Sequence, residues 1–483
     1  MKRTRTLIVW GCSSGAGKSF VATALCRWAA RRGLRVAPFK AQNMSNNARV
    51  VPLADGGCGE IGAAQYFQAL AAGVAPMVDM NPVLLKPEAD TASQVVLQGR
   101  VARELSRMPW RERSPALAAA ARESFERLAA QHDLIVVEGA GSPAEINLAP
   151  QDYVNLHTAR WAREIGPTQA LLVADIDRGG AFAHLHGTWA LLPDDLRPLL
   201  QGFVFNKFRG DASLLAPGPA QLQALTGVPL RAVLPMQRDH GLPEEDGLYA
   251  TEAQGSGLRI AIVAGPHISN LDEFHPLSRL PGVELVWARS AGALRGADWV
   301  VLPGSKQVRG DLRWLRALGL EAALHAHVQA GRPLLGICGG LQMLGRSLHD
   351  PEGVDGQPYA DEPGLGLLPL RTHYRAPKRL LAGTVRFGAP QGPWAALAGV
   401  QAQGYEIRCG HTQSEVPAVL HGADGQAIGW QQGAVLGLYA HGLFEDTAVL
   451  RALFGQRVPT LHQAFEQLAD LIEVQPGLCQ LLG

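Results

Sequence analysis

The chain has 483 residues, a length that predicts two or three domains at about 150 residues per domain. Hydrophobic residues make up 47% and charged residues 18%, which is ordinary for a globular protein. The 44 basic and 43 acidic residues nearly cancel, and no run of about 18 apolar residues occurs, so neither nucleic acid nor a membrane is expected as a partner. The six cysteines are scattered, without a CxxC pair or a zinc-like spacing, which predicts a cytoplasmic protein without a disulfide framework.

In the first half of the chain, short apolar runs alternate with amphipathic stretches. This alternation is typical of a parallel sheet with helices packed on it. Ligands bind open parallel sheets at the carboxyl ends of the strands, so the polar residues that follow each strand are candidates for a binding site. The expected strands are Thr6–Trp10, Arg35–Pro38, Leu134–Glu138, Ala170–Asp175 and Gly202–Asn206.

A glycine-rich loop, GCSSGAGKS at residues 11–19, follows the first strand and precedes an amphipathic helix. In such a context the backbone N–H groups around Gly15 and Gly17 converge on phosphate oxygens. Lys18 adds a positive charge, and the hydroxyl of Ser19 is expected to ligate Mg²⁺. The loop therefore predicts an ATP site, and a glycine-rich turn that merely begins a helix is the weaker alternative.

Two further strand ends carry polar side chains suited to this site. Glu138, in VVEGAGSPAE, ends an apolar strand at a point where its carboxylate could hold Mg²⁺. Lys40, Gln42 and Asn43, in KAQNMSNN, follow the second strand and are candidates for contact with substrate or phosphate. The alternatives are an acid that caps a helix or faces solvent, and a loop whose polar side chains satisfy one another.

The last two strand ends of this half are also polar. Asp175 and Asp177, in VADIDRGG, could face Mg²⁺, face substrate or cap a loop. Asn206 and Lys207, in FVFNKFRGD, suit contacts to a purine base, with an exposed turn as the alternative. ATP and Mg²⁺ are thus expected as cosubstrate and metal, and no tightly bound cofactor is predicted.

The composition changes after Pro235, where the sequence becomes polar and contains several prolines and glycines. We therefore expect an ATP-binding domain at 1–235, a linker at 236–256 and a second domain at 257–483. The second half again alternates apolar and amphipathic stretches, so the predicted class is α/β with two doubly wound, mostly parallel sheets. Its first expected strands are Leu258–Ala264, Trp299–Leu302 and Pro333–Ile337, and the stretch 350–365 is expected to be a surface loop.

A cysteine follows the third of these strands, in PLLGICGGLQMLG. A sharp turn from strand to helix with glycine neighbours exposes a nucleophile, and the start of a helix favours a thiolate. The N–H of Gly339 could face a developing oxyanion, and the tight turn in VVLPGSK offers Gly304 as a second donor. Cys338 is therefore the expected nucleophile, with a buried, inert cysteine as the alternative.

A cysteine nucleophile needs a base. His441, in VLGLYAHGLFED, follows an apolar strand and precedes a glycine, a placement that suits a preorganised base. The other histidines of the second half lie mostly in polar or helical surroundings and are expected at the surface. His441 is therefore the expected base.

The segment GICGGLQ, residues 336–342, resembles the nucleophile elbow of class I glutamine amidotransferases. The resemblance implies that the cysteine attacks the side-chain amide of glutamine and releases ammonia, and that Gln342 helps to hold the glutamine. In most members of that class, an acid two positions after the histidine orients it. Here that position is Leu443, and whether Glu445 takes its place stays open.

The phosphate loop is one residue longer than the common GxxxxGK[ST] form and resembles the dethiobiotin synthetase branch of P-loop proteins, which activates carboxylates with ATP. KAQNMSNN, EGAGSPAEINL, DIDRGGAFA, NKFRGD and GYEIRCGHT together resemble the cobyric acid synthase family of cobalamin biosynthesis, over essentially the whole chain. The resemblance implies amidation of the b, d, e and g carboxylates of adenosylcobyrinic acid a,c-diamide, through acyl phosphates and ammonia released at Cys338. Each amide would consume one glutamine and one ATP.

Other functions stay open at this point. A cobyrinic acid a,c-diamide synthase has the same parts and a different regiochemistry. The amidase pair that modifies lipid II usually divides the two activities between chains. A ParA-like ATP switch with an inactive amidotransferase module is the non-enzymatic alternative, which an intact cysteine and histidine disfavour. The expected partners are small molecules (corrinoid, glutamine and ATP), and no oligomeric state is predicted.

Overall fold

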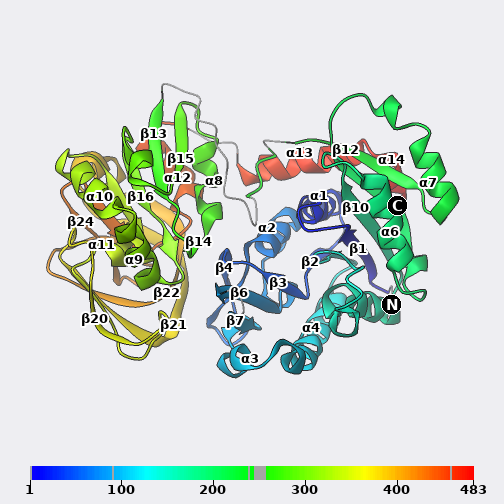
Figure 1. Ribbon diagram of the computed structural model, residues 1–483, viewed down its shortest axis with the longest axis horizontal. Helices are drawn as coiled ribbons and strands as arrows, with labels where there is room; N and C mark the ends of the chain where they lie inside the picture. Colours follow the sequence, from blue (N-terminus) through cyan, green and yellow to red (C-terminus); the bar gives the residue numbers. More distant parts are fainter. Residues whose placement is uncertain (1–2, 90–91, 238–239, 244–256, 457–459, 483) are drawn as a thin grey trace.

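The computed structural model describes residues 3–89, 92–237, 240–243, 257–456 and 460–482. They form two α/β units that lie side by side, one built mainly from the first half of the chain and one from the second (Figure 1). Most of the predicted linker 236–256 lies outside the described residues. Among the helices of the described part, none is both long and apolar enough to cross a membrane.

The first unit is built on a six-stranded sheet in which all neighbouring strands are parallel. Alternate side chains of its first strand lie in different buried clusters, Leu7 and Val9 in one and Ile8 and Trp10 in the other. Continuous apolar runs are expected of strands that are buried on both faces. The strands are β1 (Arg5–Gly11), β2 (Val36–Phe39), β9 (Leu134–Glu138), β10 (Thr168–Asp175), β11 (Leu200–Phe208) and β12 (Leu230–Pro235), in the spatial order β12-β11-β10-β1-β9-β2.

Helices cover both faces of this sheet, as predicted for a doubly wound fold. One face carries α1 (Lys18–Arg31) and α2 (Ala63–Ala72). The other face carries α4 (Trp110–Gln131), α5 (Thr158–Ile165), α6 (Ala181–Leu191) and α7 (Gly218–Thr226). The five strands predicted for this half are all present, and the sequence did not predict β12.

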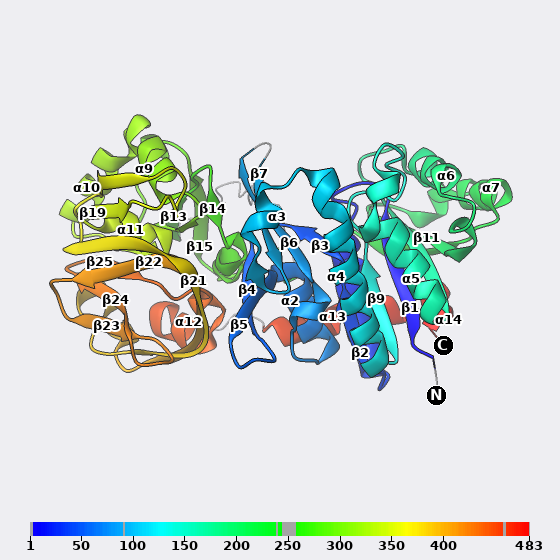
Figure 2. The same cartoon turned by 90° about the horizontal axis from the view of Figure 1, so that it is seen from below.

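Short strands between β2 and β9 form the side of the first unit that faces the second (Figure 2). One small sheet contains β3 (Gln42–Met44), β6 (Val83–Ala89), β7 (Ala92–Leu97) and β8 (Arg100–Val101), and α3 (Arg103–Arg107) follows it. A separate antiparallel pair contains β4 (Ala48–Pro52) and β5 (Cys58–Gly62). This pair packs against two long strands of the second unit, so the segment after Lys40 reaches across the interface.

The second unit is built on a mixed sheet. Its parallel part has the order β15-β13-β16-β18-β25, with β13 (Leu258–Val263), β15 (Val283–Ala288), β16 (Trp299–Leu302), β18 (Leu334–Ile337) and β25 (Val435–Leu438). A mostly antiparallel extension adds β19 (Ser347–Asp350), β20 (Tyr359–Pro363), β21 (Leu370–Phe387), β22 (Gln401–Ser414), β23 (Ala418–His421) and β24 (Ala427–Gln432). The surface loop predicted at 350–365 is therefore wrong for β20, which pairs with β19.

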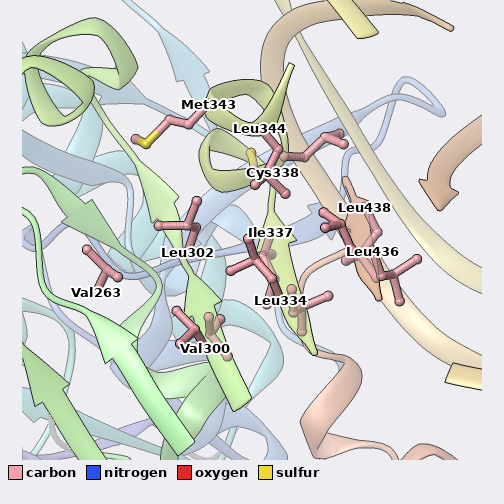
Figure 3. Close-up of a cluster of buried hydrophobic side chains, with 14 of the residues drawn as sticks. Val263, Val300, Leu302, Leu334, Ile337, Cys338, Met343, Leu344, Leu436 and Leu438 are labelled. Carbon is pink, nitrogen blue, oxygen red and sulfur yellow. The ribbon is translucent and has the colours of Figure 1, made fainter. Parts of the chain in front are cut away.

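Short elements complete this unit, and buried apolar side chains pack along β18 and its neighbouring strands (Figure 3). The elements are β14 (Ile268–Ser269), β17 (Gly304–Ser305), α8 (His275–Ser278), α9 (Val308–Ala317), α10 (Leu320–Gln329), α11 (Gly339–Leu344) and α12 (Thr447–Phe454). Leu302, Ile337 and Leu438 come from three adjacent strands and pack in one cluster. Cys338 lies at the end of this cluster, so close packing fixes the turn that carries it.

The last two helices, α13 (Leu461–Glu473) and α14 (Pro476–Leu482), pack on the first unit (Figure 1). The apolar face of α13 shares a buried cluster with α1, and Arg31 of α1 pairs with Asp470 at 2.6 Å. The division at 1–235 and 257–483 stays a prediction. The packing nevertheless shows that the C-terminal segment returns to the first unit.

We expect Phe465→Ala to lower the free energy of unfolding by about 3–5 kcal/mol, because it leaves a cavity where a ring that is 3% exposed packs in the cluster of α1. The shift of the urea midpoint of the intact chain measures the effect. Leu214→Ala, which truncates a side chain that is 81% exposed, should change stability by less than about 0.5 kcal/mol. Equal midpoints for the two variants would show that α13 contributes no packing to the first unit.

Candidate active sites

Cys338 lies at the turn between β18 and α11, with backbone angles φ 51° and ψ −103°. A positive φ is uncommon for a residue other than glycine, and such strain is typical of a nucleophile on a sharp corner. The backbone N–H of Cys338 donates to the carbonyl oxygen of Leu438 at 2.8 Å, so β25 holds the turn. The thiol lies 3.5 Å from the carbonyl oxygen of Ile407 on β22.

His441 follows β25 and is only 1% exposed. Its ring lies close enough to Cys338 for the two side chains to interact electrostatically, and it stacks on Tyr405, with ring centroids 5.3 Å apart. Backbone hydrogen bonds of 2.8 and 3.2 Å run between Tyr405 and His441 in both directions. The structure thus brings together the thiol and the imidazole that were predicted separately.

Glu273, a residue that sequence reasoning missed, completes this arrangement. It lies on the 3₁₀ helix η6 (Leu271–Phe274) and is fully buried. The Nδ1 atom of His441 is 3.0 Å from Oε1 of Glu273, and the backbone N–H of Gly442 donates to Oε2 at 3.1 Å. A carboxylate in this position fixes both the orientation and the tautomer of an imidazole.

The charges around His441 favour the protonated ring. Burial alone would lower the pKa of His441, but the charges of Glu273 and Cys338 and their hydrogen bonds outweigh it and raise that pKa to about 10. An imidazolium beside a cysteine stabilises the thiolate, which is the nucleophilic form.

Glu445 does not take the place of the missing acid, because it pairs with Arg49 while Glu273 contacts His441. The carboxylate Oε1 of Glu445 accepts a hydrogen bond from Arg49 at 2.5 Å, and Leu443 is buried in the apolar core. Glu273 lies 168 positions before His441, so no local spacing in the sequence marks it. The one available signal was an acidic pair in an otherwise apolar stretch, NLDEFHPL.

Gly304 and Gly339 lie at close approaches around the same site. A Cβ on Gly304 would be 3.1 Å from Cε1 of His441, and a Cβ on Gly339 would be 2.7 Å from the backbone nitrogen of Ser305. The two loops predicted to supply oxyanion donors therefore contact each other, and one of them contacts His441. Side chains at these positions would force the loops apart.

Gln342 is buried behind the turn. Its Oε1 accepts a hydrogen bond from the hydroxyl of Tyr374 on β21 at 2.7 Å. A Cβ on Gly410 of β22 would be only 2.3 Å from its Nε2. The side chain thus ties α11 to β21 and β22, and its contact with a bound glutamine stays a prediction.

In the first unit, the phosphate loop and the end of β9 form a second constellation. Lys18 Nζ donates to the carbonyl oxygens of Ser13 and Gly141, both at 3.0 Å, so its ammonium group lies across the mouth of the loop. The hydroxyl of Ser19 donates to Oε1 of Glu138 at 2.9 Å. Three of the residues predicted for this site are therefore held close together.

Glu138 is the centre of a buried hydrogen-bond network. Lys40 Nζ donates to Oε1 at 2.8 Å, and the side-chain amides of Gln68 and Gln65 reach Oε2 at 2.5 and 3.4 Å. Burial would raise the pKa of Glu138, but Lys40 and the hydrogen-bond donors outweigh it and lower that pKa, so the carboxylate is ionised. Asn43 joins the network by donating to Gln65 at 3.3 Å.

The oxygens of Ser19 and Glu138 fit Mg²⁺ chemically, because the ion prefers hydroxyl and carboxylate oxygens together with phosphate and water. Within the residues that the structure describes, no group of three or more His, Cys, Asp or Glu side chains is arranged for a metal. Nucleotide phosphates and water would therefore have to complete the coordination shell. The two ligands stay predictions.

Asn206 and Lys207 hold the phosphate loop from the side. Asn206 Nδ2 donates to the carbonyl oxygen of Ala16 at 3.0 Å, and Lys207 Nζ donates to that of Gly15 at 2.8 Å. Gly17 has φ 96°, and a Cβ there would lie 1.9 Å from Nδ2 of Asn206, so only glycine fits. Contact of Asn206 and Lys207 with a purine base stays a prediction.

The remaining candidates lie further around the loop. Asp175 accepts from Lys207 at 3.0 Å, whereas Asp177 accepts from Arg209 at 2.8 Å at the surface. Gln42 accepts from the hydroxyl of Tyr153 at 2.5 Å. These contacts show what each side chain touches within the protein, and contact of Gln42, Asp175 and Asp177 with substrate, phosphate or Mg²⁺ stays a prediction.

Two family models match the chain. Residues 7–247 match the CobQ/CobB/MinD/ParA nucleotide binding domain, and residues 259–449 match the CobB/CobQ-like glutamine amidotransferase domain. Together the two matches cover the units that carry the two constellations.

Likenesses to solved structures are weak. A glutamine amidotransferase is 20% identical, with a TM-score of 0.29, and the match covers 44% of this chain and 100% of that one. The signal recognition particle receptor FtsY of Elizabethkingia anophelis is 16% identical, with a TM-score of 0.31, over 49% of this chain and 61% of that one. At these scores neither likeness supports a conclusion about the sites.

Curated relatives match almost the whole chain. The cobyric acid synthase of Methylibium petroleiphilum is 60% identical and the match covers 99% of this chain and 97% of the relative. That of Leptothrix cholodnii is also 60% identical, over 99% and 96% of the two chains. That of Polaromonas sp. is 54% identical, over 99% and 98%. The chain therefore belongs to the cobyric acid synthase family of glutamine-dependent, amide-forming enzymes.

Proposed function

We propose that this chain amidates the b, d, e and g side-chain carboxylates of adenosylcobyrinic acid a,c-diamide to give adenosylcobyric acid, with glutamine as nitrogen donor and ATP as energy source. The similarity of the whole chain to proteins named cobyric acid synthase carries the proposal. The contacts among Cys338, His441 and Glu273 in one unit, and among Ser19, Lys40 and Glu138 in the other, support it.

In the second unit, the sulfur of Cys338 attacks the side-chain carbonyl carbon of glutamine. A C–S bond forms and the electron pair moves to the oxygen, which the N–H groups of Gly304 and Gly339 stabilise. His441 gives its proton to the departing nitrogen, so the C–N bond breaks and ammonia leaves. Water then attacks the thioester with the neutral imidazole as base, and glutamate is released. Glu273 holds the ring in place through both steps.

In the first unit, an oxygen of the substrate carboxylate attacks the γ-phosphorus of ATP, and ADP leaves with the electron pair of the broken P–O bond. Lys18 and the N–H groups of the phosphate loop hold the phosphates. Ser19 and Glu138 would hold Mg²⁺, which offsets phosphate charge when bound. The nitrogen lone pair of ammonia then attacks the acyl phosphate, and phosphate leaves as the amide forms.

Mass spectrometry of the corrinoid product tests the substrate. With the a,c-diamide, ATP and glutamine, we expect the addition of four amides. The addition of two amides to cobyrinic acid itself would instead favour a cobyrinic acid a,c-diamide synthase. If the chain hydrolyses ATP but forms no amide with either glutamine or ammonium chloride as nitrogen donor, the result would favour the ParA-like switch.

Glu273→Gln should lower the kcat of glutamine hydrolysis by about 10²–10⁴-fold, because one amide oxygen replaces two carboxylate oxygens that accept from His441 and Gly442. Glutamate release by the purified chain measures the rate. Glu415→Gln, at an exposed pair with Arg346, is the matched control and should leave the rate unchanged. A larger loss in Glu445→Gln than in Glu273→Gln would make Glu445 the orienting acid.

Glu138→Gln should lower ATP-dependent amidation by about 10²–10³-fold, the effect of losing one preorganised charged contact. The loss should be the same with glutamine and with ammonium chloride, whereas Cys338→Ala should lose only the glutamine-dependent reaction. Asp195→Asn, at a surface pair with Arg160, is the control. Amidation from ammonia that survives in Glu138→Gln would contradict the placement of the ATP site.

A further inference from the structure

Arg49 of β4 belongs to the ATP-binding unit, but its side chain is buried against the glutamine-hydrolysing unit and is 2% exposed. Its guanidinium forms ion pairs with Asp272 and with Glu445, the latter at 2.5 Å. It also lies over the ring of Tyr405, 5.1 Å from the centroid. One side chain of the first unit thus contacts three segments of the second.

Each of these three segments carries part of the Cys338 site. Asp272 directly precedes Glu273 on η6. Tyr405 stacks on the ring of His441 and shares backbone hydrogen bonds with it. Glu445 ends the 3₁₀ helix η9 (Leu443–Glu445), which follows His441 in the chain. Arg49 therefore contacts the supports of both the base and its orienting acid.

Hydrogen bonds beside Arg49 fix the same junction. The backbone N–H of Leu271 donates to Oδ1 of Asn47 at 3.0 Å, and the backbone N–H of Ala48 donates to Oδ1 of Asn270 at 3.3 Å. These reciprocal bonds join residues 47–49 to the loop that carries Glu273. A shift of either segment along the other would break both.

The same stretch leads back to the ATP site. The carbonyl oxygen of Asn47 accepts from the backbone N–H of Ala63, the first residue of α2. Two glutamines of α2, Gln65 and Gln68, reach Oε2 of Glu138. A short series of direct contacts therefore connects Glu138 and α2 to Asn47, which lies two residues before Arg49.

Charge explains why Arg49 is needed. Asp272, Glu273 and Glu445 are three carboxylates close to one another; Arg49 pairs with Asp272 and Glu445, and His441 pairs with Glu273. Burial and repulsion from Asp272 and Glu273 outweigh Arg49 and raise the pKa of Glu445 to about 7. Without Arg49, Asp272 and Glu445 would lose the cation that pairs with both of them, and their repulsion would act on the neighbouring Glu273.

We propose that Arg49 is a positioning residue of the glutamine-hydrolysing site that the ATP-binding unit supplies, and that Asn47 and α2 connect it to that unit's ligands, so that glutamine hydrolysis responds to bound ATP and corrinoid. The inference rests on the proposed function, because it needs both activities in one chain. It goes beyond that function, because the steps of glutamine hydrolysis and amidation described above require the Cys338 site but no control of it by the other unit.

Glutamine hydrolysis by the full chain, with and without ATP and the a,c-diamide together, tests the proposal. In the unchanged chain the two ligands should raise the rate by about 5–150-fold, the usual range of coupling between sites. Arg49→Lys should lower kcat about 10–100-fold with an unchanged KM for glutamine, because lysine cannot bridge two carboxylates while lying flat on a ring. It should also abolish the response to the two ligands.

Two further variants separate positioning from a loss of stability. Asn47→Ala alters no buried charge, and it should also abolish the response to ATP and corrinoid. Arg31→Lys, at the pair with Asp470 on α13, changes another arginine that joins the C-terminal segment to α1 and should leave both the rate and the response intact. Amidation from ammonium chloride should be unchanged in all three variants.

The outcomes are distinct. A response that survives in Arg49→Lys and Asn47→Ala would overturn the proposal, as would a parallel loss of glutamine hydrolysis and ammonia-dependent amidation in Arg49→Lys. An unchanged chain that hydrolyses glutamine equally fast with and without the two ligands would overturn the coupling and leave the proposed function standing. An unchanged chain with neither activity would overturn the proposed function itself.

Discussion

Buried charges join the two units, and the placement of the two sites depends on them. Arg49 pairs with Asp272 and Glu445, and a second cluster pairs Glu60 of β5 with Lys86 and with Lys378 of β21. Charges removed from water are costly unless each is paired and hydrogen-bonded. A different register between the units would leave several of them unpaired, so these contacts select one arrangement.

Within that arrangement, each site combines a strained or crowded backbone with a densely packed support. Cys338 has a positive φ, and the apolar side chains of three strands hold the turn below it (Figure 3). Gly17 leaves room for the Asn206 amide against the phosphate loop. In both places the core supplies the rigidity that keeps reacting groups in position, because a close-packed interior cannot deform without losing contacts.

The sequence predicts those parts of the fold that depend on local pattern. Apolar runs predicted five of the six strands of the first sheet, and the residues around Lys18 and Cys338 predicted both turns, because strand, glycine and functional group are adjacent in the chain. Glu273 could not be found this way, because only the folded chain brings η6 to His441. The apolar face of α13 shows that it packs on something, but not that its partner is α1, more than four hundred residues earlier.

The position of the orienting acid and the contact between the units are one structural feature. A histidine needs an acceptor at Nδ1, and geometry rather than order in the chain decides which residue supplies it. An acid two positions after His441 would be positioned by the turn that follows His441 itself, but in this chain that position is Leu443, which packs in the core. An acid at Glu273 is held by a loop whose next contacts are Asn47 and Arg49. An acid on that loop therefore makes the orientation of the base depend on contacts with the first unit.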